Sequence, residues 1–160
     1  MFRMTFHTFS FWDQLRTRYI ELFGEEPTTD GVLDQIQAQL GVTIPRDFRT
    51  ISSFYSGGMV GGISHHAIAT QGPATNVVTE TLRLRESIAL PHSLLVLAEP
   101  VESLVILATD HSRSQPAVIW IDSIDASNLN NVESLHNPQT WSSYADFFEF
   151  LLDREVEERG

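Results

Sequence analysis

Two residue types are missing from this chain of 160 residues, which contains no cysteine and no lysine. Without cysteine the protein can form no disulfide, no thiolate metal site and no thiol nucleophile. No apolar run approaches the roughly 18 residues that span a bilayer. The first residues also lack the basic stretch and the uninterrupted apolar stretch of a secretory signal. These absences lead us to expect a cytoplasmic protein.

Positive charge is scarce as well. Arginine provides all 10 basic residues against 21 acidic ones, so the formal net charge is −11. Residues 99–160 hold 12 acidic residues and three arginines, whereas residues 1–98 hold nine and seven. Nucleic acids are bound through Lys and Arg contacts to phosphate, so this acidity favours a basic protein partner instead. We expect such a partner to meet the acidic residues around the sheet half of the chain: Glu99, Glu102, Asp110, Asp122, Asp125 and Glu133.

The length and the hydrophobic fraction of 42% are typical of one globular domain with a sizeable core. No internal repeat or linker interrupts the chain, so we interpret residues 1–160 as a single domain. Apolar residues at helical spacing, each set preceded by a capping residue or a proline, predict helices at about 12–23, 32–40, 45–55 and 144–152. From the residues alone, 76–87 fits either a strand or a helix capped by Asn76.

Short runs rich in Val, Ile and Leu dominate the second half of the chain. They predict consecutive antiparallel strands at 94–98, 104–109 and 117–122, with 59–69 extended and 123–139 mostly loop. Helices followed by strands and a last helix are typical of an α+β fold. We expect an antiparallel sheet of about four to six strands flanked by about five helices.

The glycine cluster from Gly57 to Gly62 superficially suggests a phosphate-binding loop. Such a loop ends in Lys-Ser or Lys-Thr and opens a helix, whereas this cluster follows a predicted helix in a chain without lysine. We expect a helix stop followed by a strand that packs closely against another element.

His65 and His66 form the one adjacent histidine pair. Neighbours on a strand point to opposite faces, so they cannot easily chelate one metal ion, and we expect surface or partly buried histidines and no metal. Ser64-His65 and Asp110-His111-Ser112 contain triad residue types, but adjacency is not triad geometry. Carboxylates close in sequence, such as Asp122 and Asp125, are interpreted as solvated loop residues.

The phenylalanine-rich stretches are predicted to belong to the core: Phe2, Phe6, Phe9 and Phe11, and Phe147, Phe148 and Phe150.

One longer pattern stands out. Residues 32–58 combine an amphipathic helix ending in Leu40-Gly41, an Ile-Pro step at Pro45, then Phe48 and a helix that closes on a glycine pair. Residues 76–97, 117–122 (which include Trp120 and Asp122) and 144–151 continue the pattern in order. Over residues 30–152 the chain therefore resembles the SUKH superfamily.

The resemblance implies an α+β domain, a helix over 76–87, and a protein-binding scaffold with no catalytic residues and no cofactor. Bacterial members are similar to immunity proteins that neutralise polymorphic toxins, many of them nucleases, and fungal Smi/Knr relatives act in cell-wall assembly signalling. The matching motif residues are expected to serve the fold: Gly41, Pro45, Phe48, Gly57, Gly58 and Trp120.

Three functions remain open at this point. The first is an immunity protein that blocks a basic toxin domain through its acidic surface. The second is an adaptor that recognises a partner without toxic activity. The third is a hydrolase that works through histidines and carboxylates, and its activity would depend on His65, His66 or His111.

Overall fold

The computed structural model describes residues 10–110 and 115–160. Within these residues the chain forms five α-helices, two 3₁₀ helices and six strands. The α-helices are α1 (Phe11–Phe23), α2 (Asp30–Leu40), α3 (Arg46–Ser52), α4 (Val77–Ile88) and α5 (Tyr144–Arg159). The strands are β1 (Gly58–Val60), β2 (Ile63–His65), β3 (Leu94–Ala98), β4 (Ser103–Ala108), β5 (Val118–Asp122) and β6 (Gln139–Trp141), and the 3₁₀ helices are η1 (Ser123–Asn128) and η2 (Val132–Ser134).

The six strands form one antiparallel sheet in chain order, from β1 to β6. The join between β2 and β3 is the narrowest, because its register consists of His65 opposite Ala98. The central strands β3, β4 and β5 pair over longer stretches, with an irregularity between Val96 and Ala98. The predicted α+β fold with an antiparallel sheet is confirmed.

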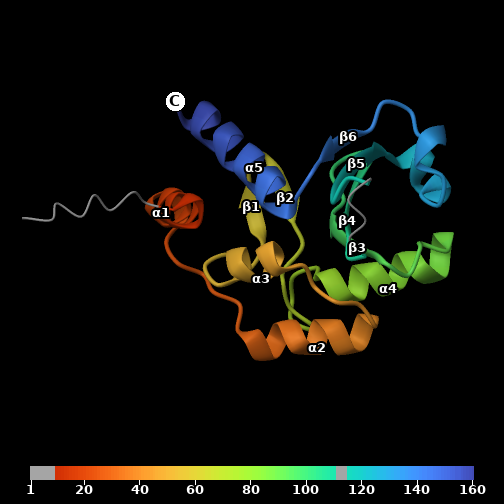
Figure 1. The fold of residues 1–160 in the computed structure, drawn as a ribbon, viewed down its shortest axis with the longest axis horizontal. Coiled ribbons are helices and arrows are strands. Elements are labelled where there is room, and N and C mark those ends of the chain that lie inside the picture. Colours follow the sequence, from red (N-terminus) through yellow and green to blue (C-terminus); the bar gives the residue numbers. More distant parts are fainter. Residues whose placement is uncertain (1–9, 111–114) are drawn as a thin grey trace, which may run out of the picture.

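Side chains of the central strands alternate between two core clusters, one on each face of the sheet. Helices cover both faces (Figure 1). Leu95, Leu97 and Val105 pack into the larger core with α1, α2, α3 and α5. Val96 and Ile106 point the other way, into a second cluster with residues from α4 and η1. Both faces of the central strands are therefore buried, and these strands meet solvent mainly at their ends.

Polar caps begin the helices, as the sequence patterns predict. Ser10, Thr29, Asn76 and Ser143 each accept a hydrogen bond from the backbone N–H three residues further on. The ambiguous stretch 76–87 is helical: the amide oxygen of Asn76 accepts from the N–H of Thr79 at 2.8 Å. No helix in the described parts of the chain has both the length and the apolar character that crossing a bilayer requires.

Two expectations about secondary structure need correction. The stretch 123–139 contains η1, η2 and the start of β6, so it is not mostly loop. The third helix ends at Ser52, earlier than predicted, and Pro45 precedes its first residue as the N-cap.

Phenylalanines at the two ends of the chain differ in their environment. Phe147 and Phe148 are fully buried, as expected, and Phe150 is partly buried against the same core. Phe11, however, is 41% exposed, so it was wrongly assigned to the core. Phe2, Phe6 and Phe9 lie outside the described residues.

Candidate functional site

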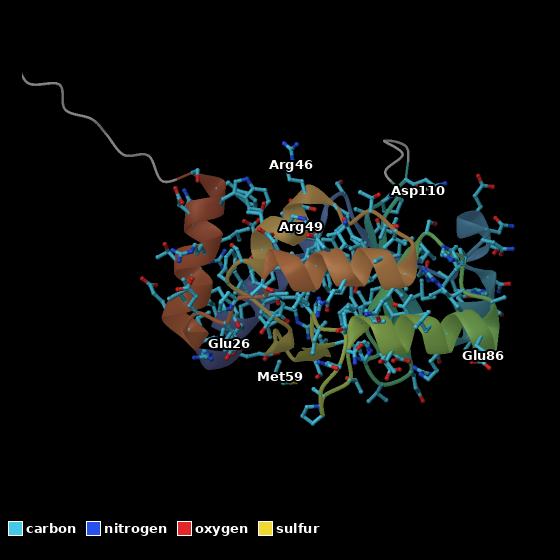
Figure 2. All side chains as sticks on the ribbon, turned by 90° about the horizontal axis from the view of Figure 1, so that it is seen from below. Glu26, Arg46, Arg49, Met59, Glu86 and Asp110 are labelled. Atoms are coloured by element: carbon cyan, nitrogen blue, oxygen red, sulfur yellow. The ribbon has the colours of Figure 1, made fainter. Side chains whose placement is uncertain are left out.

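The six acidic residues predicted to meet a partner do not form one cluster. Glu102 directly precedes β4 and Asp110 follows it, so these two residues lie at opposite ends of the same strand. Figure 2 shows Asp110 on the side of the molecule from which Arg46 also projects. Glu133 is exposed on η2. The structure therefore divides the predicted set among separate surfaces.

Glu102 and Asp122 do lie together, at one end of the sheet. Ser103 at the start of β4 pairs with Asp122 at the end of β5. One residue further along, the backbone N–H of Ser123 donates to the carbonyl oxygen of Glu102 at 2.9 Å. The Asp122 carboxylate also caps η1 by accepting from the N–H of Ile124 at 3.1 Å. The β3–β4 turn and the junction between β5 and η1 thus present two exposed carboxylates.

The β3–β4 turn and η1 also carry exposed apolar side chains that were not predicted from the sequence. Val101 is 91% exposed and Ile124 is 69% exposed. We call Val101, Glu102, Asp122 and Ile124 the turn patch. An apolar residue in each of two segments that the sequence leaves outside the predicted strands is a signal that could have revealed it, because turns and loops in soluble proteins are usually polar.

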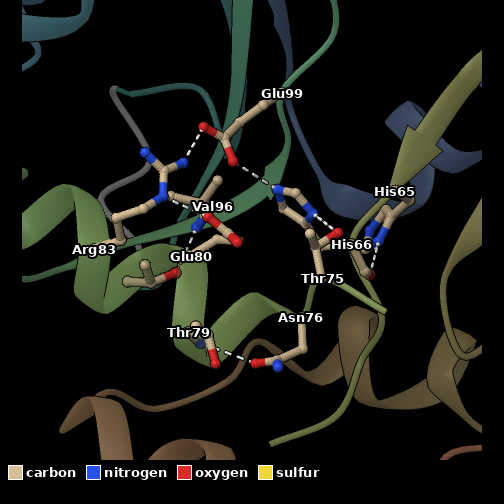
Figure 3. A network of polar contacts seen from close by, with 10 residues as sticks. His65, His66, Thr75, Asn76, Thr79, Glu80, Arg83, Val96 and Glu99 are labelled. Atoms are coloured by element: carbon tan, nitrogen blue, oxygen red, sulfur yellow. Dashed lines mark hydrogen bonds and ion pairs between the residues drawn. The ribbon is translucent and has the colours of Figure 1, made fainter. Parts of the chain in front are cut away.

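Glu99 belongs to a polar network beside the patch (Figure 3). One carboxylate oxygen lies 3.0 Å from Nε2 of the buried His66, and the other pairs with the guanidinium of Arg83. The His66 Nδ1 lies 2.8 Å from the hydroxyl of Thr75, and Arg83 also pairs with Glu80 at 2.6 Å. The network joins α4 to the ends of β2 and β3 and fixes the residue from which the β3–β4 turn begins.

Replacing Glu99 by alanine should lower the free energy of unfolding by about 1–3 kcal/mol, because the buried Nε2 of His66 loses its hydrogen-bond partner. Glu102→Ala is the matched control: this carboxylate is exposed, and its loss should change stability by less than about 0.5 kcal/mol. Urea denaturation of the two variants measures the difference. Equal losses would show that the network does not hold the turn.

Asp125 is buried, with no exposed surface, and faces inward. Its carboxylate accepts from both the backbone N–H and the ring Nδ1 of His136, at 2.9 and 2.8 Å. The bond from the imidazole is the main reason that the pKa of Asp125 is lowered, and the same bond raises the pKa of His136. Asp125 thus ties η1 to the segment after η2, and we leave it out of the proposed contact surface.

Most arginines of the described residues are engaged within the protein. Five of them form ion pairs with carboxylates: Arg16, Arg18, Arg49, Arg83 and Arg159. Arg85 donates to two backbone carbonyls, and Arg154 lies over the ring of Phe150. The turn patch therefore adds negative charge to a surface on which most positive charge is already paired.

The adjacent histidines are both buried, which corrects the expectation of surface or partly buried residues. His65 lies in the aromatic core, where its Nδ1 donates to the carbonyl of His66 at 2.7 Å and its Nε2 accepts from the hydroxyl of Tyr144 at 2.9 Å. Burial lowers the pKa of His65 to about 4, so the ring is neutral near pH 7. The described residues contain no group of three potential metal ligands.

A pocket of about 420 Å³ lies at the start of α3, mostly between apolar side chains that include Ile44, Pro45 and Leu107. Of its two charged residues, Asp47 is occupied by the backbone, since its carboxylate accepts from the N–H groups of Phe48 and Ala145 at 2.8 and 3.0 Å. Arg46 projects outward from the molecule (Figure 2). The pocket therefore places no carboxylate that is free for acid–base chemistry beside its apolar walls.

Comparison with protein families decides the classification. A family model described as SUKH_5, SMI1-KNR4 cell-wall, matches residues 11–154, which cover both the helical half and the sheet. The chain belongs to the SUKH_5 family. Comparison with curated proteins found no match for the sequence.

Backbone conformation and steric contacts explain the glycine pair of this SUKH_5 protein. Both residues have a positive φ, +98° at Gly57 and +107° at Gly58. A Cβ on Gly57 would stand 2.5 Å from the carbonyl oxygen of His66, whereas a Cβ on Gly58 would meet nothing within 4 Å. The expected close approach is confirmed between the segment before β1 and the segment after β2, but the glycines are not the helix stop, because α3 already ends at Ser52.

The other motif residues of this SUKH_5 protein also serve local structure. Gly41 ends α2 in the left-handed conformation, and its N–H donates to the carbonyl of Gln37. Phe48 is fully buried, with its ring 4.6 Å from that of Tyr144. Trp120 packs against the larger core from β5. These contacts explain the motif by packing and backbone geometry.

Proposed function

We propose that this SUKH_5 protein is a non-enzymatic immunity protein that binds and neutralises a cognate toxin domain with a basic surface. The observation that carries the proposal is the turn patch, where the exposed residues Val101 and Ile124 lie next to the carboxylate residues Glu102 and Asp122 at one end of the sheet. Membership of the SUKH_5 family supports a role in protein binding.

The charge distribution suits a basic partner in two ways. The net charge of −11 attracts a cationic domain over a distance and raises the rate of encounter. At contact, the carboxylates of the patch can face the Lys and Arg side chains with which a nuclease holds its phosphate substrate. A protein that occupies such a basic groove excludes the substrate from it.

The test is growth rescue. The toxin domains encoded by neighbouring genes are expressed alone and together with this protein, and we expect co-expression to restore growth. Glu102→Lys should weaken the rescue because it reverses a charge within the patch. Glu157→Lys makes the same charge change near the exposed end of α5 and should leave the rescue intact.

Growth arrest that persists with the wild-type protein for every neighbouring toxin gene would refute neutralisation. A stable partner from the same gene neighbourhood that arrests no growth would instead favour the adaptor function. Equal effects of the two lysine substitutions would show that only net charge matters, which contradicts a localised acidic contact.

A further inference from the structure

The turn patch differs from every other exposed apolar position in the described chain. The large apolar side chains with substantial exposure are Phe11, Met59, Leu82, Val101, Ile124 and Val156. Four of them stand on separate elements, namely α1, β1, α4 and α5. Val101 and Ile124 are the two most exposed; Val101 lies in the β3–β4 turn and Ile124 on η1, and the N–H of Ser123 donates to the carbonyl of Glu102 between these two segments. Single exposed apolar residues are ordinary, whereas a neighbouring pair indicates a contact surface.

The backbone that carries the pair is held firmly. The N–H of Ser103 donates to the carbonyl of Pro100 at 2.9 Å, which closes the β3–β4 turn, and Ser123 bonds to Glu102 across the two turns. Beneath the turns, Leu104 and Ile121 are buried between the sheet and its covering helices. The network around Glu99 fixes the start of the turn. A surface that is already ordered loses little conformational entropy when a partner binds.

The chemistry of the patch indicates which class of molecule binds there. It combines two exposed apolar residues with the carboxylates of Glu102 and Asp122, one and two positions away along the chain, and protein interfaces likewise combine apolar and polar contacts. A nucleic acid is repelled by the carboxylates. An uncharged protein surface would desolvate both carboxylates without supplying an opposite charge, and Asp122 would keep only its hydrogen bond from the N–H of Ile124. The complementary surface is an apolar hollow on a protein, bordered by Lys or Arg.

We propose that Val101 and Ile124 are the apolar anchors of the interface and insert together into a base-rimmed hollow on the toxin domain. The identity of that partner rests on the proposed function, but the location of the interface does not. The anchors supply most of the binding free energy, and the carboxylates supply orientation and speed of association.

The end of α5 provides a matched control. Val156 is also an exposed aliphatic residue, and Glu157 follows it in sequence, but among the described residues Val156 is the one large apolar residue of α5 with substantial exposure. We compare Val101→Ser/Ile124→Ser with Val156→Ser in binding to the purified toxin domain of the neighbouring gene. The double variant should bind at least about 100-fold more weakly, since two apolar anchors are lost. The control should bind within about twofold of the wild type, and unchanged melting temperatures confirm that all variants fold.

Toxin binding that is kept in full by the double variant would overturn the proposed interface and leave the neutralising function standing. A second probe tests the location without the toxin: a synthetic peptide of alternating arginine and leucine, titrated into the isotope-labelled protein and followed by NMR. Shifts should centre on residues 100–103 and 121–125. Shifts centred on the acidic exterior of α5, or no shifts, would overturn the interface whether or not the toxin binds.

Discussion

Gly57→Ala should lower the free energy of unfolding by about 3 kcal/mol or more, the largest effect that we expect from a single added methyl group. The positive φ of +98° strains any residue with a side chain by about 1–2 kcal/mol. The new Cβ would also stand 2.5 Å from the carbonyl oxygen of His66 and 2.8 Å from the Cα of Ala67, so two backbone segments must separate. Overpacking of this kind adds about 1–3 kcal/mol.

Gly58→Ala is the control for backbone strain alone. Its φ of +107° is similar, but a Cβ there meets no atom within 4 Å. This variant should therefore lose only about 1–2 kcal/mol. Urea denaturation of both variants separates the steric contribution from the conformational one. Equal losses would mean that the segment after β2 imposes no steric limit on the side chain at position 57.

Lowering the pH should decrease the free energy of unfolding, because His65 is buried as a neutral ring. Its pKa is about 4 in the folded protein and 6.5 as an unperturbed side chain, so the unfolded chain binds a proton first as the pH falls. The stability contributed by the neutral ring is present above pH 6.5 and is progressively lost toward pH 4. The loss approaches about 3 kcal/mol at pH 4, since each pKa unit corresponds to 1.36 kcal/mol.

His65→Gln tests this origin. Glutamine offers one donor for the carbonyl of His66 and one acceptor for the hydroxyl of Tyr144, but it does not titrate. Denaturation is measured at several pH values between 7 and 4. Over this range the free energy of unfolding should fall by about 3 kcal/mol more for the wild type than for the variant. The same pH dependence in both proteins would assign the acid sensitivity to other groups.

Much of the fold was predictable because local signals agreed with one another. The run at 94–98 is wholly apolar and the run at 117–122 is rich in β-branched residues, and the structure has β3 and β5 there, within one residue. Asn76 was compatible with a helix cap, yet the alternation after it also suited a strand, and only the resemblance to SUKH proteins favoured the helix. The short elements in 123–139 escaped prediction because η1 and β6 depend on tertiary partners, such as the hydrogen bond between Asp125 and His136.

The candidate site was only partly accessible from the sequence. A count of acidic residues located the charge in the second half of the chain, but it could not separate Asp125, which is buried, from Glu102, which is exposed. That distinction depends on how the segment after β5 folds back on itself. Val101 and Ile124 could not be grouped from the sequence because they are 23 positions apart. The register of β4 against β5 brings the β3–β4 turn next to the start of η1.

Neutralisation through the turn patch is tested most directly by the activity of the purified toxin domain, titrated with the wild-type protein and with Val101→Ser/Ile124→Ser. We expect the wild type to abolish the activity, with an association rate that falls as salt screens the carboxylates of the patch. The double variant should leave the toxin active at the concentration at which the wild type inhibits it fully. Full toxin activity in the presence of excess wild-type protein would contradict neutralisation, and equal inhibition by the double variant would contradict the role of the patch.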